Sequence, residues 1–491
     1  MKKLTYQVLE DSGFREYLLK EAPERVLQFG EGNFLRAFVD YFIDVLNEKA
    51  GFNGKAVLAQ PIAPGLADVI NAQEGLYTLF LRGREHGQQV NRKRVISCVS
   101  RCLNPYQDYP SLLNCAKNPD LRFLVSNTTE AGIVFDPACR FDDVPPSSFP
   151  AKLTRFLYER YKLGLPGFVI LSCELIDHNG EALRQCVENY CTLWGLEDGF
   201  SRWALTENLF CSTLVDRIVT GYPRAEAAEI CRELGYEDSL IDTGEVFGFW
   251  VIEGPQSLKE ELPFEKAGLP VIVVDDHTPY KQRKVRILNG AHTSMVLGAY
   301  LAGQDIVRAC MEDEVIRGFM NKTIYNEIIP TLDLPREELT DFAAAVTERF
   351  NNPYIDHSLL AISLNSTAKW KARVMPSLLE YVHRKGLLPA CITFSFAAYI
   401  AFYHAGREMD AGCLIGKRGD STFEIKDDQW VLDFFYHHRD DEAKALTHAV
   451  VNNKKMWNGA LARLPGFESA VAAALERIQA VGIYEAMKEC L

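Results

Sequence analysis

A short, mostly apolar segment that turns on two glycines into a long amphipathic segment constrains the fold more than any other feature of this chain. Residues 25–29 are followed by Gly30-Glu-Gly-Asn-Phe34 and then by residues 35–46, whose apolar positions recur at helical spacing. A strand that leads through glycines directly into a helix is the first unit of a doubly wound α/β sheet, in which backbone N–H groups meet a pyrophosphate at the helix start. We therefore expect cofactor contacts from the whole turn, which comprises Gln28, Phe29, Gly30, Glu31, Gly32, Asn33 and Phe34.

The glycine signature is incomplete, because Leu35 stands where the usual G-x-G-x-x-G pattern has its third glycine. A strand–helix connection also uses glycine for conformational reasons alone, so a plain turn explains this motif as well as dinucleotide binding does. The second strand, within residues 56–61, carries Gln60 near its end instead of the Asp or Glu that would bind a ribose 2′-OH. No arginine stands beside it to favour a 2′-phosphate. We expect NAD, although this strand alone leaves the choice between NAD and NADP open.

Two further buried segments end in polar residues where a sheet of this kind binds its ligands. Residues 123–126 run into Asn127, Thr128 and Thr129, and residues 167–173 run into a polar cluster at 174–180. Ligands of open α/β sheets lie outside the carboxyl ends of the strands. Residues 127–129 are therefore candidates for the nicotinamide side of the cofactor, although turns and helix caps use the same residue types.

The pattern of the sequence changes near residue 277. Before it, strand-like segments alternate with helical ones, and residues 271–274 are the last strand-like segment. After it, nearly every segment has helical periodicity, and the glycine-rich residues 411–420 have the composition of a surface loop. Because 491 residues exceed one compact core, we predict an α/β protein of two domains. A Rossmann-like dinucleotide-binding domain is expected at 1–276 and a mostly α-helical substrate and catalytic domain at 277–491, with the active site in the cleft between them.

The first helical segment of the second domain carries three side chains that suit carbonyl chemistry. Lys284, Asn289 and His292 lie on one side of a regular α-helix at roughly 100° per residue, with Lys284 and Asn289 about 140° apart. A lysine whose pKa is lowered by burial can exchange a proton near neutral pH, a carboxamide can hold an oxyanion, and an imidazole can orient a hydroxyl. A solvated helix face would give the same spacing. Ile287 and residues 295–297 argue against that alternative, because they indicate a largely buried helix whose polar groups need partners.

Composition argues against several classes of protein. The net charge of −13 disfavours a nucleic-acid partner, and no apolar segment is long enough to span a membrane. The thirteen cysteines include no C-x-x-C pair and lie mostly within apolar segments, as the reduced thiols of a cytoplasmic protein do. The first residues lack the apolar core of a signal peptide. No H-E-x-x-H motif or other convincing ligand spacing is present, so we expect no metal.

Three motifs together resemble the polyol-specific long-chain dehydrogenase/reductase family, to which mannitol dehydrogenases and hexuronate reductases belong. They are the glycine turn, the segment 210–218 and the K-x4-N-x2-H motif at residues 284–292. The resemblance runs over most of the chain and implies hydride transfer between a nicotinamide cofactor and a small sugar substrate.

The resemblance also implies roles for single residues. It makes Lys284 the general acid/base, Asn289 the residue that stabilises the alkoxide-like oxygen, and His292 a substrate ligand. It further assigns Asp216, in the V-D-R-I sequence, and Lys369 to the substrate side.

Within the family, residues 28–37, 349–357 and 363–376 are most similar to hexuronate reductases, which act on a keto-hexuronate. Two departures from the mannitol-type pattern also indicate a changed substrate. Leu175 stands where mannitol-type members have a second oxyanion asparagine, and Ala361 stands where they have an arginine.

A substrate carboxylate must be met by a cation, since an unpaired buried charge is costly. Lys369, Lys371 and Arg373 are the candidates, and the resemblance favours Lys369. The alternatives are an enzyme for a different keto-hexuronate or a neutral polyol, a non-catalytic dinucleotide-binding sensor, or a metal-dependent hydrolase. The complete lysine–asparagine–histidine set disfavours the sensor.

Overall fold

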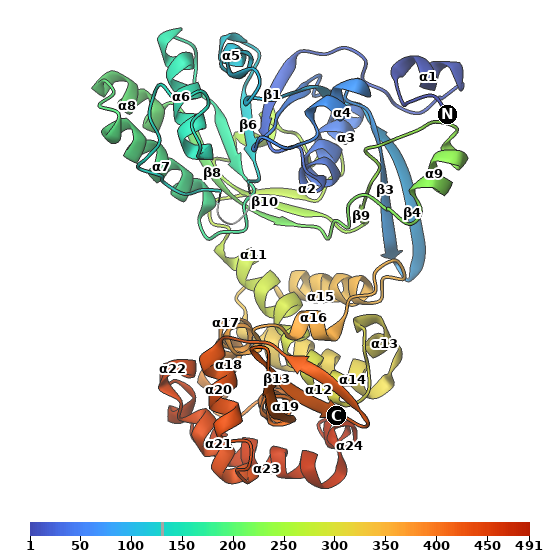
Figure 1. The fold of residues 1–491 in the computed structure, drawn as a ribbon, viewed down its shortest axis with the longest axis vertical. Coiled ribbons are helices and arrows are strands. Elements are labelled where there is room, and N and C mark those ends of the chain that lie inside the picture. The colour runs from blue at the N-terminus through green and yellow to red at the C-terminus, as the bar shows by residue number, and fades with distance from the viewer. Residues whose placement is uncertain (129–131) are drawn as a thin grey trace. The chain divides into compact units, whose positions relative to one another are not determined.

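The computed structural model describes residues 1–128 and 132–491, and the chain divides into two compact units (Figure 1). The first unit contains residues 1–83 and 89–277, and the second contains residues 84–88 and 278–491. The first is an α/β unit and the second is mostly helical, which confirms the predicted fold class.

The first unit is built on an eight-stranded sheet with the order β11-β10-β8-β7-β6-β1-β2-β5. All neighbouring strands are parallel except β8 and β10, which are antiparallel. The strands are β1 (Glu24–Phe29), β2 (Lys55–Ala59), β5 (Val99–Leu103), β6 (Phe123–Ser126), β7 (Val169–Ser172), β8 (Leu209–Asp216), β10 (Phe249–Glu253) and β11 (Val271–Val274). A second, three-stranded sheet, which the sequence did not predict, contains β3 (Tyr77–Glu85), β4 (Gln88–Ile96) and β9 (Asp242–Glu245).

Helices cover both faces of the eight-stranded sheet, because successive residues of its central strands point into two separate cores. Val26 of β1 belongs to one core and its neighbour Leu27 to the other, and Val125 and Leu124 of β6 divide in the same way. The helices of this unit are α1 (Tyr6–Asp11), α2 (Asn33–Leu35), η1 (Arg36–Asp40), α3 (Tyr41–Ala50), α4 (Ala67–Ala72), α5 (Tyr109–Asn114), η2 (Cys115–Lys117), α6 (Phe149–Lys162), α7 (Asn179–Leu193), α8 (Asp198–Thr206), α9 (Ala227–Leu234) and α10 (Leu258–Glu261).

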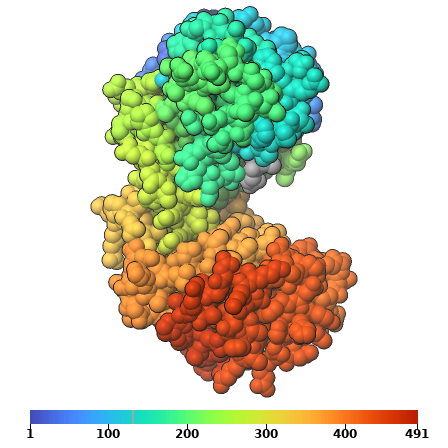
Figure 2. All heavy atoms as spheres, turned by 90° about the vertical axis from the view of Figure 1, so that its left-hand side faces the viewer, coloured from blue at the N-terminus to red at the C-terminus, as the bar shows by residue number. Residues whose placement is uncertain are grey.

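The second unit packs its helices around two central ones, α12 and α19, which contact each other and are buried along most of their length. Its helices are α11 (Thr278–Arg283), η3 (Lys284–Asn289), α12 (Gly290–Leu301), α13 (Val307–Glu312), α14 (Glu314–Lys322), η4 (Thr323–Ile328), η5 (Ile329–Thr331), α15 (Arg336–Phe350), α16 (Leu359–Ser363), α17 (Ser366–Arg373), α18 (Met375–Lys385), α19 (Ala390–His404), α20 (Gln429–His437), α21 (Ala443–Val451), α22 (Lys454–Trp457), η6 (Leu461–Arg463), α23 (Phe467–Val481) and α24 (Ile483–Lys488). In the space-filling view the last part of the chain, coloured red, forms much of one face of this unit (Figure 2).

The prediction of a surface loop at 411–420 was wrong. The unit contains a three-stranded antiparallel sheet of β12 (Gly406–Asp410), β13 (Cys413–Arg418) and β14 (Ser421–Ile425), and within 411–420 only the pairs Ala411-Gly412 and Gly419-Asp420 form turns. Gly416 lies within β13 under the ring of Phe423, where an added Cβ would come within 2.6 Å of the ring. This glycine therefore marks a close contact between strands and does not break a strand.

All thirteen cysteines are free thiols, and twelve of them are buried. Across residues 1–128 and 132–491, no helix combines the length and the apolar character needed to cross a bilayer.

Candidate functional site

The carboxyl ends of β1, β2, β6 and β7 meet at one edge of the eight-stranded sheet. Phe29 pairs with Ala59 on one side and with Ser126 on the other, and Ser126 pairs with Ser172. The glycine turn and the polar residues that follow β6 and β7 therefore share this edge. It is the place where sheets of this type bind their ligands, and it is the candidate cofactor site.

Gly30 has a backbone conformation that side-chain-bearing residues rarely adopt. Its φ is +130°, and a Cβ there would lie 2.9 Å from Cδ1 of Leu35 and 3.2 Å from the carbonyl oxygen of Asn127. Leu35 occupies the place of the missing third glycine because its side chain packs against this turn. Gly32 directly precedes α2, and a Cβ on Gly32 would meet no atom within 4 Å. The helix start is thus open on the side that a pyrophosphate would approach.

Arg36 stabilises the glycine turn through hydrogen bonds. The sequence pattern did not identify this residue. Its buried guanidinium donates hydrogen bonds to the carbonyl oxygens of Glu31 (3.2 Å) and Leu240 (2.7 Å) and to Oδ1 of Asn33 (2.6 Å). The carboxylate of Asp242 lies 3.8 Å away. The side chain of Asn33 therefore holds the turn in shape. An arginine among the apolar residues of the predicted helix was the available signal.

Gln28 and Phe29 support the turn from within the core. Their side chains are 0% and 2% exposed, so a cofactor could reach them only through their backbone. Nε2 of Gln28 donates to the carbonyl oxygen of Gly30 at 3.0 Å. Phe34 is half-buried and stacks on Phe38, with their ring centroids 5.2 Å apart.

Glu31 reaches the loop that follows β2. Its Oε1 accepts a hydrogen bond from the backbone N–H of Leu66 at 3.4 Å, and burial raises the pKa of the Glu31 carboxyl. Gln60 is occupied within the same loop, where its Nε2 donates to the carbonyl oxygens of Ile62 (2.8 Å) and Ala63 (2.7 Å). An acidic group is therefore present at this loop although β2 carries none. No sequence pattern connects residue 31 with this position.

Glu174 links the ends of β6 and β7. Its carboxylate accepts hydrogen bonds from the hydroxyl of Ser126 (3.1 Å) and from the backbone N–H (3.1 Å) and hydroxyl (3.0 Å) of Thr128. The side chain of Asn127 donates to the carbonyl oxygen of Cys173 at 2.7 Å. Burial raises the pKa of Glu174, which these three hydrogen bonds oppose. The polar residues after the two strands thus hold each other, and the predicted contact Thr129 lies outside the described residues.

Asp216 and Leu175 also belong to the first unit. Asp216 ends β8 and is buried, and it pairs with Phe249 of β10. The next residue, Arg217, donates to the carbonyl oxygen of Ala37 at 2.6 Å and so ties β8 to η1. Leu175 is 63% exposed just beyond β7.

In the second unit, the segment with Lys284 and Asn289 is a π-helix, so the prediction of a regular α-helix was wrong for these residues. The backbone N–H of Gly290 bonds to the carbonyl oxygen of Val285, five residues earlier. Residues five apart follow one another along a π-helical face, whereas in an α-helix they diverge by about 140°. The π-turn therefore aligns Lys284 with Asn289 more closely than the sequence suggested. Both side chains are half-buried.

His292 lies one turn further on, in α12, and is enclosed by aromatic rings. Its ring stacks on Phe350 at a centroid distance of 3.9 Å and meets the ring of His357 edge-on at 5.5 Å. Burial lowers the pKa of His292 well below its ordinary value, and the nearby positive charges act in the same direction. Nε2 of this buried ring has no hydrogen-bond partner within residues 1–128 and 132–491. A neutral imidazole with an open nitrogen suits a substrate hydroxyl.

Lys369 and Arg373 lie four residues apart on α17, on one face of that helix. The start of α12 packs directly on α17, since a Cβ on Gly290 would lie 3.1 Å from the carbonyl oxygen of Arg373. Lys369 Nζ donates to the carbonyl oxygen of Ile362 at 2.8 Å. Lys371, the third candidate cation, donates instead to Oδ1 of Asn458 at 3.1 Å.

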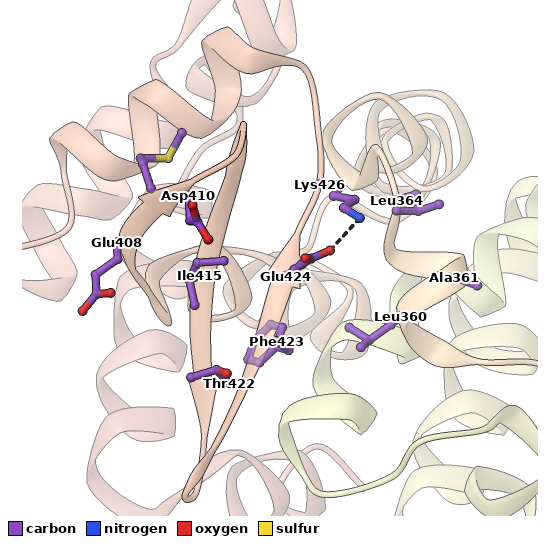
Figure 3. Close-up of a pocket in the computed structure, with 11 residues that line it drawn as sticks. Leu360, Ala361, Leu364, Glu408, Asp410, Ile415, Thr422, Phe423, Glu424 and Lys426 are labelled. Carbon is purple, nitrogen blue, oxygen red and sulfur yellow. Dashed lines mark ion pairs between the residues drawn. The ribbon is translucent and has the colours of Figure 1, made fainter.

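A large cavity of about 950 Å³ in the second unit lies between α16 and the three-stranded sheet (Figure 3). Leu360 and Ala361 of α16 line it together with Leu364, which directly follows that helix. An ion pair between Glu424 and Lys426 (2.6 Å) lines it from β14 and the residue that follows. None of the predicted catalytic or substrate residues lines this cavity. Ala361, which stands where mannitol-type members have an arginine, therefore borders this cavity.

One group in the described part of the chain brings three possible metal ligands together. Donor atoms of Glu253, Asp276 and His277 lie within 4.8 Å of one another. Oε2 of Glu253 lies 2.6 Å from Nδ1 of His277 and accepts the backbone N–H of the same residue at 3.1 Å. These two contacts give Glu253 a structural role at the ends of β10 and β11.

Both units match models of one protein family. Residues 24–266 match the mannitol dehydrogenase Rossmann domain, and residues 276–479 match the mannitol dehydrogenase C-terminal domain. The chain is 47% identical over 485 residues to the altronate oxidoreductase of Klebsiella pneumoniae (strain 342), an alignment that covers 96% of this chain and 98% of that protein. The altronate oxidoreductase of Escherichia coli O139:H28 (strain E24377A / ETEC) is 46% identical with the same coverage.

Two solved structures share the fold along the full chain. A substrate-free D-sorbitol dehydrogenase aligns with a TM-score of 0.81 and 21% identity, covering 99% of this chain and 100% of that one. The Pseudomonas fluorescens mannitol 2-dehydrogenase, in a ternary complex with NAD and D-mannitol, aligns with a TM-score of 0.68 and 21% identity, covering 99% of each chain. At this level of identity the likeness concerns the fold.

Proposed function

Because the chain belongs to the mannitol dehydrogenase family, we propose that it is an NAD-dependent oxidoreductase that interconverts D-tagaturonate and D-altronate by hydride transfer. The observation that carries this proposal is 47% identity, over 96% of the chain, to a protein named altronate oxidoreductase. In this role the enzyme would serve the breakdown of galacturonate.

The first unit fits a dinucleotide. Gly30 and Gly32 keep the helix start free of side chains, and Arg36 holds the turn rigid from the inside. We assign the pyrophosphate to this turn and the nicotinamide side to the ends of β6 and β7. The Glu31 carboxyl at the loop after β2 opposes a 2′-phosphate there, which favours NAD over NADP. Bound NADH supplies the hydride.

The second unit supplies the proton and the polar contacts. Protonated Lys284 donates to the carbonyl oxygen of the ketone as that oxygen gains charge, and the reverse transfer accompanies oxidation of the alcohol. The carboxamide of Asn289, aligned with Lys284 by the π-turn, donates to the same oxygen. Nε2 of His292 holds a neighbouring hydroxyl.

The substrate carboxylate is assigned to Lys369 and Arg373. Across the described residues neither cation forms an ion pair, and burial lowers the pKa of both. A partly buried cation without a counterion favours an anionic substrate over a neutral polyol. Lys371 is engaged with Asn458 and is not part of this assignment. We assign Asp216 to substrate binding through the family resemblance alone.

The test is a panel of substrates, with turnover measured by the absorbance of the reduced cofactor. D-Tagaturonate, D-fructuronate and D-fructose are compared, each with NADH and with NADPH. The proposal predicts the highest kcat/KM for tagaturonate with NADH. Preference for fructuronate would identify the other hexuronate reductase, and preference for fructose would identify a mannitol-type enzyme.

A dinucleotide-binding sensor is the alternative from a different class. Saturable NADH binding without turnover of any keto-sugar or keto-acid would favour it. The presence of Lys284, Asn289 and His292 on one continuous helical segment favours the enzyme, because a sensor has no need of a proton donor and an oxyanion ligand.

A further inference from the structure

Two imidazole rings from different segments of the second unit lie against each other, and only one of them has a role in the function proposed so far. His292 comes from α12, and His357 comes from the segment between α15 and α16. The ring centroids are 5.5 Å apart, and the planes of the two rings are at 86° to each other. The nitrogen atoms of the two imidazoles therefore lie in nearly perpendicular planes.

The surrounding structure holds this ring pair in place. The His292 ring stacks on Phe350, with a centroid distance of 3.9 Å and an angle of 10° between the planes. The carbonyl oxygen of His357 accepts a hydrogen bond from the backbone N–H of Val307 at 3.0 Å, and the next residue, Ser358, forms a β-bridge. Packing thus fixes the ring of His292, and backbone hydrogen bonds fix the segment that carries the second ring.

The two rings differ from other histidines of this chain in having no hydrogen-bond partner. Nε2 of His292 is buried without a partner, and the ring of His357 forms no hydrogen bond either, within residues 1–128 and 132–491. By contrast, His277, His438 and His448 each place Nδ1 within 2.9 Å of a carboxylate oxygen. Because buried polar groups in proteins are hydrogen-bonded, we expect a ligand to supply the partners of the ring pair.

The chemistry of the pair suits hydroxyl groups. Burial lowers the pKa of both imidazoles, so both are neutral near pH 7. A neutral imidazole has one N–H donor and one nitrogen acceptor, and a hydroxyl can complement either of them. Since the rings are nearly perpendicular, two hydroxyls bound to them must point in different directions. On a sugar chain, the configuration of neighbouring carbons sets those directions.

We propose that His357 is a specificity-determining residue, which together with His292 binds two neighbouring hydroxyls of the substrate and selects their configuration. This inference rests on the function proposed above, in which His292 holds a hydroxyl near the ketone. D-Tagaturonate and D-fructuronate differ in the configuration of one carbon. A ring pair of fixed geometry can therefore bind one of them with both hydrogen bonds and the other with only one.

The kinetic test separates hydrogen bonding by His357 from packing of its ring. His357→Phe keeps an aromatic ring against His292 and removes the hydrogen bond, whereas His357→Gln keeps a donor and an acceptor and removes the ring. We expect the ratio of kcat/KM for D-tagaturonate over D-fructuronate to fall on the order of 10-fold in His357→Phe, and to fall less in His357→Gln. His383→Phe, at an exposed position of α18, is the matched control and keeps the wild-type ratio.

Three results would overturn the inference. They are an unchanged ratio in His357→Phe, equal losses of kcat/KM on both substrates in that variant, and a larger fall of the ratio in His357→Gln than in His357→Phe. Each of them would mean that His357 only packs against His292.

An equilibrium measurement separates this inference from the proposed reaction. The melting temperature is recorded with NADH and either D-altronate or D-mannonate, the reduced forms of the two keto-acids, so that no hydride transfer can occur. We expect altronate to give the larger increase, and we expect the difference between the two acids to be lost in His357→Phe. This result without turnover of tagaturonate would refute the reaction and leave the inference standing. Turnover of tagaturonate with no difference between the acids, or with a difference unchanged in His357→Phe, would refute the inference and leave the reaction standing.

Discussion

The chemistry proposed for this chain depends on a few side chains with contrasting surroundings. Lys284 and Asn289 are half-buried on a π-turn, where a substrate can reach them. His292 is enclosed and neutral, and its open Nε2 makes it a hydrogen-bonding group for which proton transfer is disfavoured. We therefore assign proton transfer to the lysine and orientation of the substrate to the histidine.

Removal of the Asn289 carboxamide tests its assignment to the developing oxyanion. In Asn289→Ala we expect kcat to fall about 10²–10³-fold, because one donor to that oxygen is lost. Helix packing should survive, since the hydrogen bond from the Thr293 hydroxyl goes to the backbone of Asn289. Steady-state kinetics and NADH titration measure the two effects. A rise in KM with kcat unchanged would contradict the assignment.

Glu31 is predicted to exclude NADP. In Glu31→Gln the amide can still accept the hydrogen bond from the Leu66 backbone N–H, but the negative charge is removed. We expect KM for NADPH to fall while KM for NADH changes little, so the preference for NADH narrows. The ratio of kcat/KM for the two cofactors measures this. An unchanged ratio would place the cofactor discrimination elsewhere.

At the scale of elements, the two glycines of the turn are expected to have different roles. One is needed for the fold, and the other is needed for the bound ligand. In Gly30→Ala the strained φ and the contacts with Leu35 and Asn127 should cost about 1–3 kcal/mol of unfolding free energy. In Gly32→Ala the new Cβ meets no protein atom, so stability should be retained while NADH affinity falls. Thermal melting and NADH titration measure these effects. If Gly32→Ala bound NADH as the wild type does, the pyrophosphate would not lie at this helix start.

Sequence periodicity predicted those elements whose pattern is local. The strands at 123–126 and 271–274 have the expected bounds, because their apolar residues alone decide burial. The π-turn at Lys284 and the strand at 413–418 were missed. A π-turn has no simple periodic signature, and Gly416 is explained only by the ring of Phe423 on the neighbouring strand.

Contacts between residues of different elements could not be predicted from the sequence for the same reason. Sequence spacing brought Lys284, Asn289 and His292 together, and it supplied the candidate cations of α17. It gave no indication that Phe350 and His357, from other segments, contact the ring of His292, or that Glu31 reaches the loop after β2. A local sequence pattern identifies residues that share one element. Which residues of different elements lie close together is known only from the folded structure.

At the scale of the whole molecule, the first unit buries acidic side chains whose protonation couples stability to pH. Burial raises the pKa of Asp40 and of Asp242 from 3.8 to about 7, against the opposing effect of nearby Arg36. In the unfolded chain these carboxyls titrate near their ordinary pKa. Between about pH 4 and pH 7 the folded state therefore binds more protons, and its stability falls as the pH rises through this window.

Asp40→Asn isolates this effect. The amide keeps an acceptor for the hydroxyl of Tyr77, which lies 3.1 Å from the Asp40 carboxylate, but it cannot ionise. We expect the melting temperature of the variant, relative to the wild type, to increase from about pH 5 to pH 8. A difference that is constant across this range would show that Asp40 does not titrate with folding.

The proposed reaction depends most on the ammonium group of Lys284 as the proton donor to the substrate ketone. The direct measurement is single-turnover oxidation of NADH by D-tagaturonate in the wild type and in Lys284→Ala, with NADH affinity determined on the same samples. We expect turnover to fall by at least about 10²-fold in the variant while the NADH dissociation constant stays within error of the wild type. Wild-type turnover in Lys284→Ala would contradict the account.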